Sequence, residues 1–172
     1  MTITTRRLAA GVAVTGVLGT LAFSQALQAA TAQANLSVSA TVVSQCTISA
    51  PNTLAFGNYD PVSVNATTDR DASTTFSVAC TKGAPSVWIG LNTGANASGS
   101  TRQMASGAER LIYEIYSDSS RSSVWGNTSG TGVSYTSTSK AAANLTVYGR
   151  VPAGQDVGAG SYADTVVATV NF

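Results

Sequence analysis

The feature that most constrains this chain is an alternation of apolar and polar residues with a period of two, interrupted at short intervals by turn-forming residues. Such alternation is typical of β-strands with one buried face, while glycine, proline, asparagine and aspartate mark the turns between strands. The strands predicted in this way cover residues 36–48, 54–59, 74–80, 87–91, 111–117, 144–151 and 162–172. About seven short strands predict an all-β fold, a β-sandwich of the immunoglobulin-like kind.

A break in the alternation divides the first of these segments, residues 36–48. Leu36, Val38 and Ala40 share one face of an extended chain, and the phase shifts at residues 42–43. A one-residue shift turns every later side chain to the opposite face. The break therefore indicates either a β-bulge or two strand segments joined end to end.

The first residues have the pattern of a secretory signal peptide. Arg6 and Arg7 precede an apolar run over residues 8–23, and small residues suited to cleavage follow. We expect residues 1–34 to be the signal peptide, with cleavage at about residues 29–34, and residues 35–172 to form a single domain. Because the apolar run is shorter than the roughly 20 residues that cross a bilayer, we expect an exported protein without a stable membrane anchor.

The last predicted strand ends on an aromatic residue, Phe172, with no polar tail after it. Chain ends are usually frayed unless they are held in a sheet or docked. β-Branched residues and a final phenylalanine favour a half-buried strand. We therefore expect this end of the chain to be buried against something.

The chain has two cysteines, Cys46 and Cys80. Each lies in a predicted strand, and an even number of cysteines in an exported protein favours a disulfide bond. The alternative is a pair of free thiols in a reducing compartment, which conflicts with the signal peptide. We expect an internal disulfide.

The composition argues against catalysis. The chain has no histidine, which removes the commonest general base, proton shuttle and metal ligand, and with it Ser–His–Asp triads and typical zinc sites. Only 10% of the residues are charged and the net charge is +1, so there is no electrostatic basis for binding nucleic acid or anionic membranes. We predict no enzyme activity, no catalytic residue, no metal site and no cofactor.

Three motifs resemble sites but have simpler explanations. Ser137 and Lys140 match a Ser-x-x-Lys pattern, which is expected by chance in a serine- and threonine-rich stretch. Asp69 and Asp71, with Asp60 upstream, lack the ligand spacing of a calcium loop. The glycines of residues 154–160 precede a strand rather than a helix, so they indicate turns and not a phosphate-binding loop.

The aromatic residues and the glycosylation sequons allow a second interpretation, which is a ligand-binding surface. An aromatic platform for sugars could be built from Tyr113, Tyr116, Trp88 and Trp125, although aromatic residues in strands are more often packed in a core. Asn-x-Ser/Thr sequons occur at Asn35, Asn65, Asn96, Asn127 and Asn144. Such sequons arise readily in a chain of this composition and would carry glycans only after eukaryotic secretion.

Several blocks of the sequence, in the right order, resemble the spore coat protein U domain family. The blocks are residues 38–48 (VSATVVSQCTI), 54–61 (LAFGNYDP), 111–118 (LIYEIYSD), 148–152 (YGRVP) and 160–172 (GSYADTVVATVNF). The resemblance covers essentially all of the chain after the signal peptide, with both cysteines in place. That family includes the subunits of archaic chaperone-usher pili of Gram-negative bacteria.

The resemblance implies an incomplete immunoglobulin-like β-sandwich, a pilin fold that lacks its last strand. In such subunits a periplasmic chaperone lends a strand to a hydrophobic groove beside the C-terminal strand. After passage through an outer-membrane usher, the N-terminal segment of a neighbouring subunit replaces the chaperone's strand. This is β-augmentation, and a head-to-tail contact of this type yields a fibre.

The resemblance also implies roles for particular residues. Leu36, Val38 and Ala40 would be the apolar side chains of the donor segment. The edge that faces the groove or the chaperone would comprise Val166, Ala168, Val170 and Phe172.

The expected function is that of a structural or adhesive pilus subunit that is exported through the periplasm to the cell surface and supports attachment and biofilm formation. Two alternatives remain open. One is a secreted coat or surface protein that does not form a long fibre, and the other is a secreted carbohydrate-binding module or small hydrolase.

Overall fold

The structure, a computed structural model, describes residues 29–49 and 51–172. The chain divides into two units, Met1–Ser39 and Ala40–Phe172. Most of the predicted signal peptide lies in residues 1–28, outside the described residues. In the first unit, residues 29–39 form neither helix nor strand, and all of them are exposed. No helix in the described part of the chain is long and apolar enough to cross a membrane.

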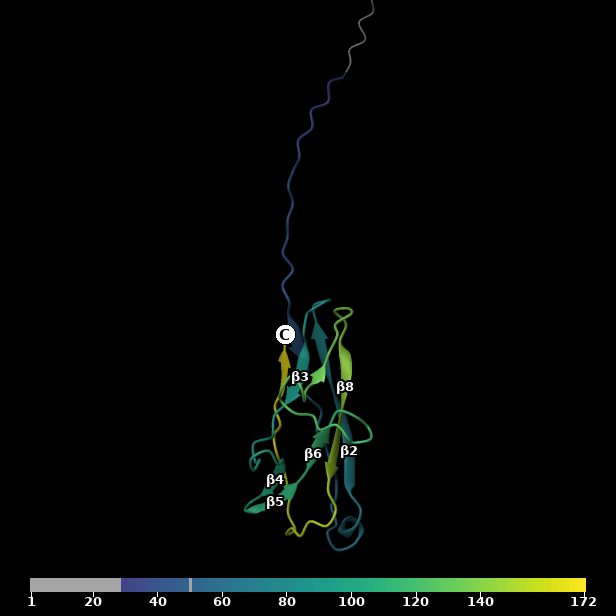
Figure 1. The fold of residues 1–172 in the computed structure, drawn as a ribbon, viewed down its shortest axis with the longest axis vertical. Coiled ribbons are helices and arrows are strands. Elements are labelled where there is room, and N and C mark those ends of the chain that lie inside the picture. The colour runs from purple at the N-terminus through teal and green to yellow at the C-terminus, as the bar shows by residue number, and fades with distance from the viewer. Residues whose placement is uncertain (1–28, 50) are drawn as a thin grey trace, which may run out of the picture. The chain divides into compact units, whose positions relative to one another are not determined.

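The second unit is built from antiparallel β-strands, and its largest sheet has four of them in the order β1-β2-β8-β6 (Figure 1). The strands are β1 (Cys46–Ile48), β2 (Arg70–Cys80), β8 (Ala143–Val151) and β6 (Glu114–Tyr116). The long central pair, β2 and β8, is in register from Arg70 opposite Val151 to Val78 opposite Ala143. Along β2 apolar side chains alternate with threonine and serine, so one face of this sheet is buried.

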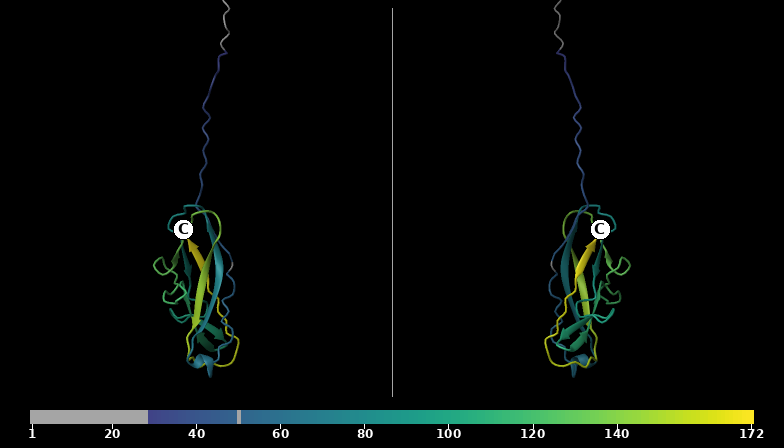
Figure 2. Two further views of the ribbon diagram at one scale, coloured as in Figure 1. Left: turned by 90° about the vertical axis from the view of Figure 1, so that its right-hand side faces the viewer. Right: turned by 90° about the vertical axis from the view of Figure 1, so that its left-hand side faces the viewer.

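A second sheet packs over the first and has the order β7-β3-β9. It comprises β7 (Val133–Ser134), β3 (Trp88–Leu91) and β9 (Ala168–Asn171), and a separate hairpin joins β4 (Gln103–Ser106) to β5 (Glu109–Ile112). Figure 2 shows the two layers from the side, with the yellow C-terminal strand beside β3. One short 3-10 helix, η1 (Val64–Ala66), follows the turn at Asp60 and Pro61.

The core lies between the two sheets. Its most deeply buried side chains are Trp125, Ile89, Val78 and Val151. The indole Nε1 of Trp125 donates a hydrogen bond to the carbonyl of Ile89 at 2.8 Å, so the one polar atom of this large side chain is satisfied. The all-β prediction is confirmed.

The expected disulfide between Cys46 and Cys80 is present. The two cysteines are also directly opposite each other in the pairing of β1 with β2. β1 is only three residues long and pairs with one strand. The disulfide therefore fastens a short edge strand to the centre of the sheet.

A buried arginine that was not anticipated ties the second sheet to its neighbours. Arg102 is 3% exposed, and its guanidinium donates to the carbonyls of Leu91, Asn92 and Trp125. It also forms an ion pair with Glu114. A buried charge is tolerated only when it is paired and hydrogen-bonded in this way.

Some strand predictions were wrong in detail. Residues 36–42 and 54–59 alternate but belong to no ladder, and only the last part of residues 162–172 pairs as β9. The hairpin of β4 and β5 was missed, because no strand was predicted between residues 91 and 111. Residues 36–42, residues 54–59 and the first part of residues 162–172 lack a ladder for the same physical reason. Alternation predicts a buried face but does not supply a pairing partner.

Candidate functional site

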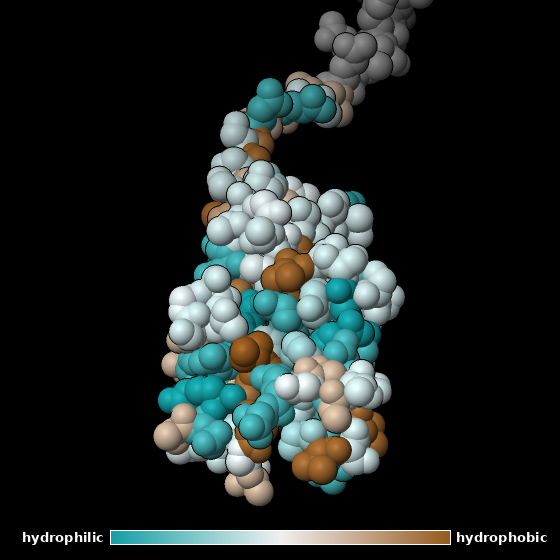
Figure 3. Space-filling model, turned by 60° about the horizontal axis from the view of Figure 1, so that its bottom comes forward, coloured by the Kyte–Doolittle hydropathy of each residue, from teal (hydrophilic) through white to brown (hydrophobic). Residues whose placement is uncertain are grey.

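A groove lies between two extended segments, and no strand of the described chain fills the space between them. One wall is residues 51–59, which continue from β1, and the other is residues 157–168, which lead into β9. The groove has a volume of about 1220 Å³. Figure 3 shows apolar surface lying in patches between hydrophilic side chains on one face of the molecule.

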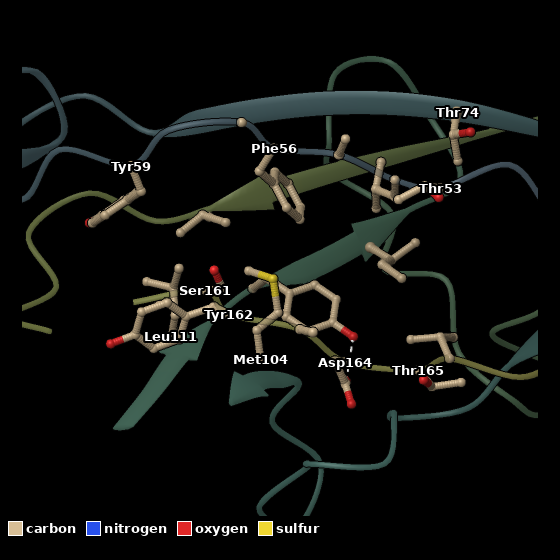
Figure 4. A pocket seen from close by; sticks show the side chains of 18 of the residues that line it. Thr53, Phe56, Tyr59, Thr74, Met104, Leu111, Ser161, Tyr162, Asp164 and Thr165 are labelled. Atoms are coloured by element: carbon tan, nitrogen blue, oxygen red, sulfur yellow. Dashed lines mark hydrogen bonds between the residues drawn. The ribbon is translucent and has the colours of Figure 1, made fainter. Parts of the chain in front are cut away.

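The floor of the groove is the apolar core itself. Phe76, Val147 and Val151 come from the four-stranded sheet, and Leu91, Leu111 and Met104 come from the second sheet and the hairpin. In the close-up, Met104 and Leu111 lie below Phe56 and face into the space between the walls (Figure 4). Five of these six side chains are at most 5% exposed, and Met104 is half-buried, so the groove lies directly above the packed core.

The C-terminal wall has one side turned to the protein and one side left open. From residue 162 to residue 170 the even-numbered side chains are half-buried and the odd-numbered ones are exposed. Ala163 exchanges two backbone hydrogen bonds with Ala105, and the carbonyls of Thr165 and Val167 accept from Ala95 and Asn92. The backbone groups of the odd-numbered residues therefore face the domain.

The same alternation leaves the even-numbered residues with unpaired backbone groups. In an extended chain successive N–H and C=O pairs point to opposite sides, so those of Val166, Ala168 and Val170 face away from β3. The register agrees, because β9 pairs with β3 alone among the described strands. This wall therefore presents an open edge to the groove.

The opposite wall is held down at a glycine. A Cβ atom at Gly149 in β8 would lie 2.7 Å from side-chain atoms of both Leu54 and Phe56, so glycine is what allows these side chains to pack directly on the sheet. Arg70 Nε donates to the carbonyl of Phe56 at 2.6 Å. This wall is anchored although it belongs to no ladder.

A polar cluster closes one flank of the groove. The Tyr113 hydroxyl donates to Asp164 at 2.7 Å, and the same carboxylate accepts from the backbone N–H and the side-chain amide of Asn96. Burial, together with the neighbouring Asp164 carboxylate, raises the pKa of Tyr113. Gly94 lies so close to Asp164 that no side chain would fit there. The cluster fixes the C-terminal wall to the loop that follows β3.

Tyr113→Phe is expected to destabilise the domain by about 2 kcal/mol, because the Asp164 carboxylate loses one hydrogen bond in a partly buried site. The measurement is the free energy of unfolding in denaturant. Tyr116→Phe is the matched control, since Tyr116 is a half-buried tyrosine of β6 outside the Asp164 cluster, and we expect this variant to leave stability nearly unchanged. Equal effects of the two variants would contradict the structural role of the cluster.

The structure brings only some of the predicted site residues to this groove. Val166 and Ala168 line it. Val170 is half-buried opposite Ile89, beyond the lining, and Phe172 follows the end of β9 with 55% of its surface exposed. Within the described chain Phe172 is therefore not buried, and its burial against a partner stays a prediction.

The predicted donor residues all lie in stretches without strand structure. Leu36 and Val38 are each 86% exposed, and Ala40 is exposed as well. Exposed apolar side chains that alternate with serine are typical of a segment that forms a strand only when it pairs with another chain. Their assignment as a donor stays a prediction.

The floor and the N-terminal wall were missed as site residues. Phe56, Leu111, Tyr113 and Met104 had no recognised role at the groove. Phe56 could have been found from the alternation of Leu54 and Phe56, which share one face of a segment that has no obvious pairing partner. Met104 carried no signal, because the hairpin that positions it was not predicted.

The motifs set aside from the sequence have structural roles. The Ser137 hydroxyl is buried and donates to the carbonyl of Cys80. Asp71 forms an ion pair with Arg150, and that hydrogen-bonded pairing lowers the pKa of Asp71. Within residues 29–49 and 51–172 no cluster of three potential metal ligands occurs.

The aromatic platform proposed from the sequence is corrected. Trp125 and Tyr113 are buried in the core, so they offer no face to a ligand. Trp88 and Tyr116 are half-buried on different sheets. Among the sequons, Asn65 is also buried, with its amide bonded to Asp60 and Thr68.

Comparisons with known proteins agree with this architecture. The family model of the Spore Coat Protein U domain matches residues 32–169. Protein U of Myxococcus xanthus is 44% identical over 173 residues, a match that covers 93% of this chain and 95% of Protein U.

A solved structure is similar in fold. It is the crystal structure of the CsuC–CsuE chaperone–tip adhesion subunit pre-assembly complex from the archaic chaperone-usher Csu pili of Acinetobacter baumannii. The TM-score is 0.56 at 25% identity, over 77% of this chain. The present chain spans 40% of the length of the matched chain.

These matches confirm the immunoglobulin-like pilin fold, and together with the disulfide they indicate an exported protein. The family is a structural one and not a family of enzymes. The chain belongs to the spore coat protein U domain family, which is related to the subunits of archaic chaperone-usher pili.

Proposed function

We propose that this protein is a structural or adhesive subunit of an archaic chaperone-usher pilus and that it polymerises by donor-strand complementation. The observation that carries the proposal is the open groove between residues 51–59 and residues 157–168, with core side chains as its floor. An open sheet edge beside an apolar groove is a liability for a free monomer. A strand from another chain would remove that liability by supplying backbone hydrogen bonds and apolar side chains at once.

The segment before β1 has the chemistry of such a strand. Leu36, Val38 and Ala40 alternate with small polar residues and are exposed, and the segment carries no charged residue from Ala29 to Gln45. At roughly 3.3 Å per residue, the wall of residues 157–168 extends over about 40 Å. Residues 35–42, which remain after the expected cleavage, extend over about 26 Å, the greater part of that length, and Val43 and Gln45 are already bonded to Thr81 of the same chain.

The proposed partners follow from the same groove. Before assembly a periplasmic chaperone would supply the missing strand, and the matched solved structure is itself a chaperone–subunit complex. An outer-membrane usher would then exchange that strand for the donor segment of a neighbouring subunit. Each subunit gives one strand and receives one, so the contact is head-to-tail and does not close on itself. The product would be a fibre at the cell surface that supports attachment and biofilm formation.

One alternative is favoured by a specific observation. The 44% identity with Protein U over nearly the whole chain is compatible with a secreted coat or surface protein that does not form a long fibre. The same groove could be filled in that case too, in a short or irregular assembly. Electron microscopy of the exported protein distinguishes the two, because only the pilus hypothesis requires long, unbranched fibres.

The test removes the donor segment. A variant that lacks residues 35–40 is expected to bind the chaperone as the wild type does, because the groove is intact, but to form no fibre. The measurements are co-purification with a co-expressed chaperone of the archaic chaperone-usher class and electron microscopy of the cell surface. Leu36→Ser with Val38→Ser should reproduce the loss, whereas Ser37→Ala with Ser39→Ala, on the other face of the segment, should assemble normally. Fibres from the deletion variant would disprove the donor assignment.

A further inference from the structure

The outer face of the second sheet carries a tryptophan that lies flat on the backbone. Ile89 is fully buried, so its neighbours Trp88 and Gly90 point to the opposite, outer face of β3. A Cβ atom at Gly90 would lie 2.9 Å from the Trp88 ring, and one at Gly132 would lie 2.7 Å from it. Glycine at both positions is therefore what allows the indole ring to lie against the sheet.

Beside this ring is a second pocket, separate from the groove. It has a volume of about 510 Å³. Trp88 and Tyr135 contribute aromatic surface, and Ser86, Ser129, Ser134 and Thr136 contribute hydroxyl groups. None of the residues that line it is charged. Ser86 is held at a φ of 54°, a conformation that costs a non-glycine residue energy and often accompanies a binding site.

We propose that the Trp88 pocket binds neutral carbohydrate. A half-buried indole face suits the apolar C–H face of a sugar ring, and the hydroxyl groups around it suit the sugar hydroxyls. The absence of charged lining residues argues against a phosphorylated, sulfated or otherwise anionic ligand, which would need a cationic partner. The volume accommodates one or two sugar rings, at the small end of ligand pockets.

This inference does not depend on the proposed assembly, because every lining residue belongs to one chain and none lies at the groove. A pilus would nevertheless make such a site effective. One weak site on each subunit becomes a repeated array along a fibre, and multivalent contact can exceed the affinity of a single site by about 10²- to 10⁴-fold. Attachment to a polysaccharide-coated surface would then be a property of the shaft.

The test uses the exported protein and measures retention on immobilised dextran, mannan and galactan, with alginate as the anionic comparison. Binding to at least one neutral polysaccharide is expected, together with a change in tryptophan fluorescence. Trp88→Ala should weaken that binding about tenfold, the equivalent of one lost stacking contact, and Trp88→Phe should lose less. Tyr148→Ala, at a half-buried tyrosine on the other sheet, should bind as the wild type does.

A second variant keeps the test informative if Trp88→Ala fails to fold. Ser129 is exposed in the loop before β7, so Ser129→Trp would fill the pocket without altering the sheet and should abolish binding. The proposal is overturned if the wild type binds none of the neutral polysaccharides or binds alginate alone. Full binding by a folded Trp88→Ala or Ser129→Trp variant overturns it as well.

Discussion

Val166→Asp is expected to abolish both chaperone capture and polymerisation. Val166 lines the groove, and its backbone groups face the open edge. A strand that docks there would bury the new carboxylate against apolar side chains with no cation to pair it, and an unpaired buried charge costs several kcal/mol. The uncaptured subunit should be degraded or aggregate in the periplasm. The measurement is the amount of subunit that co-purifies with the chaperone, together with fibre counts at the cell surface.

The next residue along the chain supplies the control. Val167 is 53% exposed, and its backbone N–H and carbonyl are already bonded to Asn92. Val167→Asp adds the same charge one residue away but on the solvent side, so secretion and assembly should be normal. If Val166→Asp assembled as well as Val167→Asp, the groove would not be the docking site. By the same argument Ala168→Asp, on the groove side, should not assemble, whereas Thr169→Asp, on the solvent side, should assemble normally.

The period of the sequence was sufficient to predict the centre of the fold. Residues 74–80 and 144–151 alternate cleanly, and they form the greater part of β2 and β8, which pair along their length. In a strand with one buried face, side-chain pattern and pairing register are set by the same requirement. The disulfide was also predictable, because two cysteines in predicted strands of an exported protein favour a bond between them.

The hairpin of β4 and β5 was not predictable in the same way. All four residues of β4 are half-buried, so no alternation marks it, and the glycines on either side resemble a loop. Its position depends instead on Arg102, whose contacts reach Leu91 and Trp125 from distant parts of the chain. A charged residue in a core gives no local sign of the carbonyls that will surround it.

The groove could be predicted from the sequence only in part. The alternation in residues 54–59 and 162–167 correctly predicted that one face of each is buried, as Phe56 and the half-buried even-numbered residues of the second segment demonstrate. It wrongly predicted ladders, because pairing needs a neighbour and the described chain provides none on that side. The location of the open edge is a property of which strands become adjacent, and no local pattern encodes it.

Removing the disulfide is expected to have the largest effect on stability. Cys46 and Cys80 are separated by 34 positions, and the chain-entropy estimate for releasing a loop of this length is about 3 to 4 kcal/mol. Cys46→Ala with Cys80→Ala should lower the free energy of unfolding by that amount, measured in denaturant on the oxidised and variant proteins. Wild type treated with reductant should match the double variant, and an unchanged midpoint in both would contradict the prediction.

The consequence should extend from stability to assembly, because β1 is otherwise weakly held. It is three residues long and pairs with β2 alone, and it continues into residues 51–59, the N-terminal wall of the groove. Without the disulfide, β1 loses its covalent link to β2, while the wall itself is still held by the contacts of Leu54 and Phe56 with the sheet and by the hydrogen bond from Arg70. Short edge elements such as β1 open at low free-energy cost. The variant should therefore exchange the amide protons of residues 46–56 faster than those of β8, and it should be captured poorly by the chaperone even under conditions where β2 and β8 remain folded.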